Sequence, residues 1–333
     1  MHPTTTTPSE PVDANVVSPG PSPRVLRIRH LIVNSYLVGD PGTSSWVVVD
    51  AGLSPFCARR ILAAAEKRFG AGVPPAAIVL THGHFDHVGG VHQLLARWDV
   101  PVYAHLLELP YLTGRASYPP PDPTVGGGLL ARLGALFPSK GINLGERVRP
   151  LPGDGVVPGM TGWRWIHTPG HSPGHVSFFR FTDRVLLAGD AFVTTKQESL
   201  LSVLTQFPQV SRPPAYFTPN WGLAERSLET LLALEPEVAA TGHGVPICGE
   251  RLRSQLKTLV NGFRKRMPSH GRYVNRPALA DETGVVTLPP PVHDPFPRMV
   301  GLGVMMLAAV ALGIHLGRAH RSVRDAESPG RSD

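Results

Sequence analysis

The chain has 333 residues, 42% of them hydrophobic and 17% charged, which is enough for one large domain or two modest ones with a substantial core. The formal net charge is +7, but the basic residues are scattered or concentrated after Arg251 and lack the interleaved aromatic residues of a recognition motif, so specific nucleic-acid binding is not expected. Two cysteines, Cys57 and Cys248, cannot form a disulfide framework.

The segment 1–23 is rich in Thr, Pro and Ser and contains no hydrophobic run. Such a composition buries too little apolar surface to order itself, so we expect a disordered leader. A secretory signal needs an apolar central region, which this segment lacks. We therefore expect a protein that is not secreted.

Alternating and β-branched residues predict strands in the first part of the chain, and a Ser-Pro pair predicts the start of a helix. The predicted strands are 25–29, 34–38 and 46–50, followed by a helix from Pro55 to about Phe69 with Ser54 as its N-cap. The apolar run 77–80 predicts a further strand, and a helix over 88–98 and a short strand over 102–104 follow.

The stretch from 106 to 144 is irregular and is interrupted by prolines at 119–121 and glycines at 126–128. So long a connection either faces a substrate or is a decorative insertion. Further strands are predicted at 163–167, 176–181, 185–188 and 238–240, and helices at 223–234 and 250–266. Strands and helices interleave in both halves, which predicts two packed sheets covered by helices.

The predicted domain, 24–270, is followed by a Pro-rich linker over 271–298. Residues 299–317 are 19 residues without a formal charge. A helix of that length would span about 30 Å, the thickness of the hydrocarbon core of a bilayer. The alternatives are a buried helix or an amphipathic surface helix. We favour a C-terminal hydrophobic helix that serves as a transmembrane anchor, followed by a basic polar tail over 318–333.

Two features of the sequence predict different orientations for this anchor. Arg318, Arg321 and Arg324 after the segment outnumber the single Arg298 before it, which by the positive-inside rule places the tail in the cytoplasm. Without an N-terminal signal, however, a folded domain made first would stay in the cytosol. We give the missing signal more weight and expect the protein at the cytoplasmic face of a membrane.

The most informative stretch is THGHFDHVGG at 81–90. It places His82, His84, Asp86 and His87 in an H-x-H-x-D-H pattern directly after a predicted strand. Imidazole and carboxylate groups of this kind bind divalent metals. The alternative is a His-rich surface turn, and the ligand-type residues that follow downstream weigh against it.

Three more candidates stand at the ends of later predicted strands. His171 lies in TPGHSPGH after the strand at 163–167, Asp190 follows the apolar run LLAG, and His243 follows the strand at 238–240. The repeated placement at strand ends is harder to obtain by chance than any single motif. The sequence therefore predicts a metal centre at one edge of the sheets.

This order of residues resembles the metallo-β-lactamase superfamily over about residues 25–250, and the segment 168–175 is most similar to its glyoxalase II-like branch. The resemblance implies an α/β (α+β) fold, a four-layer αββα sandwich of two mixed β-sheets flanked by helices, with two adjacent metal ions. By the same resemblance, His82, His84 and His171 hold one ion, Asp86, His87 and His243 hold the other, and Asp190 bridges them.

The resemblance also implies roles for residues around the metals. Asp50 in VVVDAG is similar to the aspartate of the family that steadies ligand histidines, the alternative being a capping or turn aspartate. His175 would touch substrate or steady a ligand, the alternative being a turn-stabilising histidine. The residues that stand where the family often builds its pocket are Lys196, Tyr216, Asn220 and Trp221.

The implied activity is hydrolysis of an ester, thioester or lactone of a small molecule by a metal-bridging hydroxide, with Asp86 as a catalytic group that orients the nucleophile or returns a proton. A donor set without thiolate suits zinc, with iron and manganese as alternatives. The other readings are a mononuclear iron persulfide dioxygenase, which would use His82, His171 and Asp190, a metal-dependent phosphodiesterase or nuclease, and a non-catalytic binding module. The substrate and the oligomeric state stay open.

Overall fold

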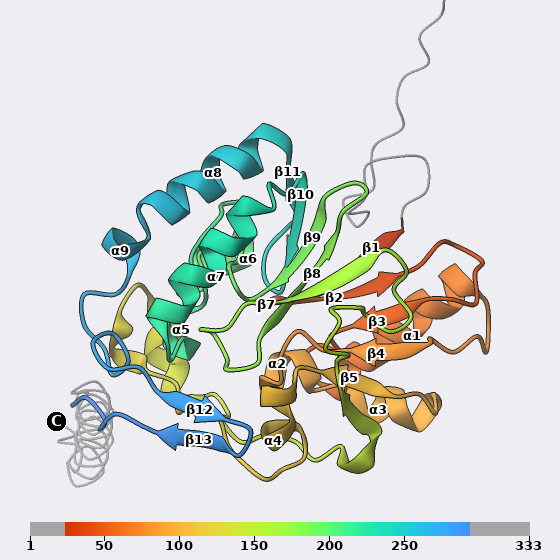
Figure 1. Cartoon of the computed structure of the whole chain (residues 1–333), viewed down its shortest axis with the longest axis horizontal. Coiled ribbons are helices and arrows are strands. Elements are labelled where there is room, and N and C mark those ends of the chain that lie inside the picture. The colour runs from red at the N-terminus through yellow and green to blue at the C-terminus, as the bar shows by residue number, and fades with distance from the viewer. Residues whose placement is uncertain (1–23, 294–333) are drawn as a thin grey trace, which may run out of the picture. The chain divides into compact units, whose positions relative to one another are not determined.

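The computed structural model describes residues 24–293, and these form a mixed α/β fold (Figure 1). The strands of the two main sheets are β1 (Val25–His30), β2 (Val33–Val38), β3 (Val47–Val49), β4 (Ala77–Val79), β5 (Val102–Ala104), β6 (Val148–Pro150), β7 (Trp163–His167), β8 (Val176–Arg180), β9 (Val185–Gly189), β10 (Val238–Thr241) and β11 (Ile247–Cys248). A separate two-stranded sheet contains β12 (Leu279–Asp281) and β13 (Gly284–Thr287).

The α-helices are α1 (Pro55–Phe69), α2 (Phe85–Val88), α3 (Val91–Arg97), α4 (Leu109–Leu112), α5 (Leu129–Arg132), α6 (Leu200–Thr205), α7 (Trp221–Ala233), α8 (Gly249–Asn261) and α9 (Phe263–Arg266). Short 3-10 turns are η1 (Leu106–Glu108), η2 (Pro123–Val125), η3 (Leu133–Leu136), η4 (Gly145–Arg147) and η5 (Ala215–Phe217). The longest helices are therefore α1, α7 and α8, and each covers a sheet.

Both main sheets are mixed. The first has the order β1-β2-β3-β4-β5-β6, in which β1, β2 and β3 pair antiparallel and β3 to β6 pair parallel. The second has the order β11-β10-β9-β8-β7, in which only β9 and β10 pair parallel. Parallel neighbours end at the same edge of a sheet, so the segments that follow β3, β4, β9 and β10 can gather there.

The buried apolar side chains form three layers, which the alternation along β3 illustrates. Val47 and Val49 point to the cluster between the two sheets, where Leu187 of β9 also lies, whereas Val48 points to the cluster under α1 and α3. A third cluster lies between the second sheet and helices α7 and α8, which Figure 1 shows over that sheet. Helices thus cover the outer face of each sheet, and the sheets face each other.

The strands and helices predicted from the sequence up to 104, and again from 163 to 266, are present with shifts of a few residues at their ends. Pro55 begins α1 as expected, but the side chain of Ser54 makes no capping hydrogen bond. Strands β6 and β11 and helix α6 were not predicted. Each is short, with two to six residues, so its hydrophobic pattern is too brief to stand out.

The predicted linker over 271–298 differs from the structure in its first part. Strands β12 and β13 form a hairpin there, and the compact unit that contains both main sheets extends to Pro291. The hairpin region is bound to the domain because Ala278 N–H donates to Pro219 O (3.0 Å) and the Tyr273 hydroxyl donates to Pro120 O (2.8 Å). Its prolines and polar residues resembled a linker, although tertiary hydrogen bonds order the segment.

The predicted leader over 1–23, hydrophobic helix over 299–317 and basic tail over 318–333 lie outside the described residues. Within residues 24–293, none of the helices has the length and apolar character needed to cross a membrane.

Candidate metal centre

The segment from the end of β4 through α2 carries four of the predicted ligands. His82 and His84 stand on either side of Gly83, and Asp86 and His87 lie in the short helix α2. Glycine is required at position 83, because a Cβ there would meet the Tyr118 hydroxyl at 2.3 Å. The loop is thus packed tightly enough to fix the direction of the imidazoles beside it.

The second sheet supplies the remaining three groups. His171 lies in the turn after β7, Asp190 follows β9 directly, and His243 follows β10. The side chains of all three are at most 2% exposed. A Cβ at Gly242 would meet Asp190 Oδ1 at 2.0 Å, so the glycine beside His243 makes room for that carboxylate.

The structure brings all seven predicted ligands together in three overlapping groups. The first is His82, His84 and His171, the second is Asp86, His87 and His243, and the third is His82, His87 and Asp190, which takes one histidine from each of the other two. Asp190 Oδ2 lies 3.5 Å from His171 Nε2 and 3.1 Å from His243 Nε2, so it reaches both the first and the second group. Within each group, the candidate ligand atoms lie within 4.8 Å of one another.

Three candidate ligand atoms that share one of these groups are buried without a hydrogen-bond partner among residues 24–293. They are His82 Nε2, His87 Nε2 and Asp190 Oδ1. A buried polar atom that is left unpaired costs about 1–3 kcal/mol, so three of them in one place is a costly arrangement unless something binds them. Lone pairs of nitrogen and oxygen that converge in this way fit a divalent cation.

Hydrogen bonds to the other ring nitrogen orient these imidazoles. His87 Nδ1 donates to Asp50 Oδ2 (2.8 Å), and His243 Nδ1 donates to Ile32 O (2.7 Å). Thr81 Oγ1 donates to Asp50 Oδ2 (2.8 Å) and can therefore accept from His82 Nδ1 (3.0 Å). When such a ring is neutral, its proton is therefore on Nδ1 and the lone pair of Nε2 is turned toward the centre.

The first group contains neutral imidazoles. Burial, followed by the neighbouring imidazoles, holds the pKa values of His82 and His171 well below their ordinary value. Burial also lowers the pKa of His84 to about 4, although the Asp86 carboxylate opposes the shift. Neutral imidazole is the form that binds a metal, so these three side chains need not lose a proton at neutral pH.

In the second group, nearby carboxylates set the pKa values of the two histidines. Burial opposes protonation of His87 and His243, but the surrounding carboxylates outweigh burial and raise both pKa values, that of His243 to about 10. Burial likewise opposes ionisation of Asp190, but His243 and then His87 hold the pKa of Asp190 well below its ordinary value. The carboxylates are therefore ionised, and their negative charge would attract a cation.

Asp50 and His175 lie directly behind the candidate ligands. Asp50 accepts from His87 and from Thr81 and caps no helix. His175 Nε2 accepts from the backbone N–H of Asp190 (2.8 Å), and its Nδ1 pairs with the Thr168 hydroxyl (2.8 Å). Asp50 thus contacts the side chain of the candidate ligand His87, and His175 contacts the backbone of the candidate ligand Asp190.

Glu108 is a further site residue that the sequence reasoning missed. Its fully buried carboxylate accepts from the backbone N–H of Gly83 (2.9 Å) and of Gly174 (2.7 Å), and also from the hydroxyls of Ser172 (2.7 Å) and Tyr118. It therefore joins the loop of His82 and His84 to the turn of His171. The sequence feature that could have indicated its role is its position as the one acidic residue within the apolar run 106–112.

Aromatic side chains from the irregular stretch and from η5 lie against the first group. The rings of Tyr118 and Phe217 are 4.6 and 4.7 Å from that of His84, and Phe137 stacks on Phe217. The stretch from 106 to 144 therefore contributes to the wall of the site. Of the predicted pocket residues, Tyr216 is buried beside this wall, Lys196 is exposed, Asn220 caps α7 and Trp221 lies in the core.

Comparisons with known proteins show the family of the chain. The family model of the metallo-beta-lactamase superfamily matches residues 28–243. Probable metallo-hydrolase YflN of Bacillus subtilis (strain 168) is 48% identical over 231 residues, which cover 69% of this chain and 87% of that protein. Probable metallo-hydrolase YybB of the same strain is 36% identical over 151 residues, or 45% of this chain and 59% of that protein.

Among solved structures, the crystal structure of TTHA1623 in a di-iron-bound form is similar at 31% sequence identity, with a TM-score of 0.47 and coverage of 67% of this chain and 93% of that one. The family model spans more than half of the chain, and the predicted ligands fall within the match. The chain therefore belongs to the metallo-β-lactamase superfamily, and its features are those of a metal-dependent hydrolase.

Proposed function

We propose that the protein is a binuclear hydrolase that cleaves an ester, thioester or lactone of a small molecule. The observation that carries the proposal is that His82, His87 and Asp190, whose ligand atoms are buried without partners, join the two other groups of candidate ligands. The two probable metallo-hydrolases among its relatives support the reaction class. The second group, with Asp86, His87 and His243, favours two ions over the mononuclear reading.

In the proposed assignment, His82, His84 and His171 hold one ion, Asp86, His87 and His243 hold the other, and Asp190 is shared. Two ions held about 3.5–4 Å apart lower the pKa of a bound water and polarise the scissile group. Because the donors are imidazole and carboxylate without thiolate, we propose zinc, with iron or manganese as the alternatives that metal analysis would reveal.

The side chains around the ions provide the remaining functions. Asp86 Oδ2 lies 3.4 Å from His243 Nε2, and nearby His87 and His243 lower the pKa of Asp86 against the opposing effect of burial. An ionised carboxylate here could orient the attacking water, accept the proton that the water loses and pass that proton to the leaving group. The aromatic wall beside His84 would exclude water and suit an apolar acyl group.

A substrate screen on the metal-loaded protein tests this proposal. It should compare a thioester, a lactone and a phosphodiester and should include an oxygen-consumption assay with a persulfide. We expect hydrolysis of an acyl substrate, lost with chelator and in His84→Ala, but retained in His92→Ala, whose side chain is exposed. Turnover of the phosphodiester alone, or oxygen consumption by protein with one iron, would overturn the proposal.

A further inference from the structure

A hollow of about 560 Å³ lies where the turn between β1 and β2 meets the start of α1. None of the seven candidate metal ligands lines it. Its lining includes a buried histidine, His30, two arginines, Arg29 and Arg60, and two apolar side chains, Leu31 and Phe56. These residues are not needed by the metal chemistry described above.

His30 lines the hollow, and one of its ring nitrogens has no hydrogen-bond partner among residues 24–293. The side chain is 3% exposed, and its Nε2 pairs with the Ser35 hydroxyl (3.1 Å). Its Nδ1 is buried and has no hydrogen-bond partner in the part of the chain that the structure describes. When Nε2 accepts the Ser35 proton, Nδ1 carries a hydrogen that a ligand can accept. A buried donor of this kind points to a missing acceptor.

The charges around His30 favour an anion. Arg60, on the first turns of α1, forms no hydrogen bond or ion pair with any of residues 24–293, and Arg29 uses only Nε, which donates to Leu31 O (3.1 Å). The side chain of Ser54 makes no capping hydrogen bond at the start of α1, where the Cys57 N–H donates to the backbone oxygen of Ser54 (2.9 Å). No acidic residue lines the hollow. Two guanidinium groups and the positive end of a helix dipole therefore act on the same space.

The rim of the hollow is apolar. Leu31 at the tip of the turn is 66% exposed, and Phe56 at the start of α1 is 65% exposed. Large apolar side chains on both sides of a cationic centre suit a ligand with a charged head and an apolar body. The left-handed backbone of Leu31 (φ 58°) presents this side chain at the tip of the turn.

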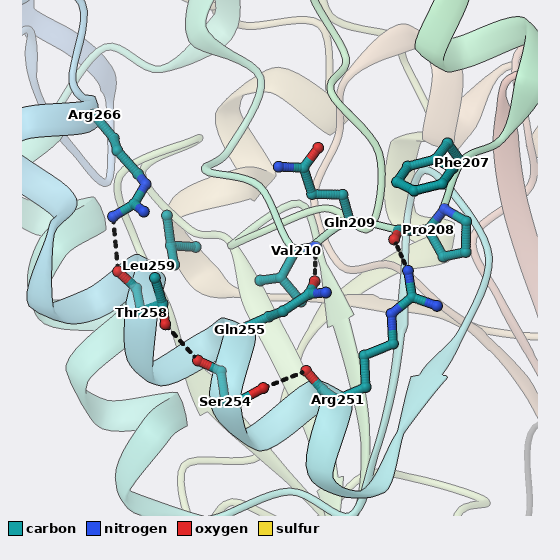
Figure 2. Close-up of a pocket in the computed structure, with 10 residues that line it drawn as sticks. All are labelled: Phe207, Pro208, Gln209, Val210, Arg251, Ser254, Gln255, Thr258, Leu259 and Arg266. Atoms are coloured by element: carbon teal, nitrogen blue, oxygen red, sulfur yellow. Dashed lines mark hydrogen bonds between the residues drawn. The ribbon is translucent and has the colours of Figure 1, made fainter.

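The groove in Figure 2 also contains two arginines, but their guanidinium groups are already hydrogen-bonded to the backbone. Arg251 donates to Pro208 O, and Arg266 donates to Thr258 O (2.7 Å), so both guanidinium groups already have backbone partners (Figure 2). The groove also lacks a buried side chain with an unpaired atom. The hollow at His30 is therefore the better candidate for an anion site.

We propose that this hollow binds a small amphipathic anion, namely an oxyanion head on an apolar chain, as in a medium-chain carboxylate or an alkyl phosphate. The head would accept from His30 Nδ1 and pair with Arg60 and Arg29, and the chain would lie between Leu31 and Phe56. The turn also supplies Ile32 O, which accepts from His243, so the bound anion would sit beside a segment that orients a metal ligand. The proposal does not depend on which reaction the metal centre performs.

Calorimetric titration of the full chain at pH 7.5 with octanoate, octyl phosphate and octanol tests the proposal. We expect saturable binding of one anion per chain, at least tenfold weaker binding of octanol, and at least tenfold weaker anion binding to Arg60→Gln. Arg59→Gln is the matched control, because Arg59 is the exposed neighbour on α1 that does not line the hollow. The tighter of the two anions identifies the preferred head group.

Phe56→Ser, on the apolar wall, should also weaken binding of octanoate. Equal binding to wild type and Arg60→Gln would overturn the proposal, as would equal binding of octanol and octanoate. Octanoate binding that disappears with chelator but persists in Arg60→Gln would place the anion on the metals and would likewise overturn it.

Discussion

At the scale of single residues, the metal centre is organised by groups that contact the ligands from behind. Asp50 fixes His87 and, through Thr81, the proton of His82, and the backbone of Ile32 fixes His243. Asp50 adopts a left-handed backbone conformation (φ 60°), which is unusual for a residue with a side chain. Its two hydrogen-bonded carboxylate oxygens offset that strain by holding the ligand loop in place.

Titration of His30 gives a prediction about stability and pH. Burial, and then the nearby Arg60, lower the pKa of His30 from 6.5 to about 4. Between these pH values the unfolded chain binds a proton that the folded chain does not, so this contribution to stability is fully present above pH 6.5 and decreases as the pH falls toward 4. His30→Gln removes the titrating group, and with it this difference in proton binding between the unfolded and the folded chain.

Urea unfolding of metal-free protein at pH 7.5 and pH 5 measures this effect. The loss of unfolding free energy between the two pH values should be smaller in His30→Gln than in wild type by about 2 kcal/mol. His92→Gln, at an exposed position, should behave as wild type. An unchanged pH dependence in His30→Gln would show that the folded protein protonates His30 as readily as the unfolded chain does.

At the scale of elements, Glu108 connects two ligand-bearing loops that come from different sheets. Glu108→Gln replaces one carboxylate oxygen with an amide donor, which would face either the N–H of Gly83 or that of Gly174. One loop would then lose its anchor, and we expect metal affinity to fall about ten- to a hundredfold, as for other residues that orient metal ligands.

Metal titration with a competing chelator gives the affinity, and circular dichroism of the metal-free variant reports whether the fold is retained. Glu66→Gln, at an exposed position on α1, is the control. If Glu108→Gln binds metal as tightly as wild type, Glu108 does not position the ligand loops.

The sequence predicted the elements that carry strong local patterns. The alternating valines of β3 and the apolar run of β4 predicted strands, and the ligands at strand ends followed from them. Glu108 could not be predicted, because its partners Gly83 and Gly174 become neighbours only after the two sheets pack together. The β12–β13 hairpin was missed for the same reason, since it depends on contacts with Pro120 and Pro219.

At the scale of the whole molecule, two packed sheets bring distant segments to one metal centre. Hydrogen bonds between segments of the two sheets, such as Val176 N–H to Thr81 O (2.9 Å) and Asn34 Nδ2 to Thr241 O (2.9 Å), hold the ligand-bearing strand ends together. The order of ligand residues along the chain was sufficient to predict this convergence through the family resemblance. Their distances and unpaired atoms required the folded structure.

The uncharged segment 299–317 gives a prediction about the full chain. We propose that it anchors the protein to a membrane, with the enzyme on the cytoplasmic face. The full chain should then sediment with membranes, and a chain ending at Pro297 should be soluble and retain its activity. Full-length protein found entirely in the soluble fraction would show that the segment is not an anchor.

The most direct test of the central claim is the number of metal ions per chain, measured by elemental analysis of the purified protein. The two groups of ligands predict two ions in the wild type and about one in His243→Ala, which removes a ligand from the second group only. One ion per chain in the wild type, unchanged in His243→Ala, would contradict a binuclear centre.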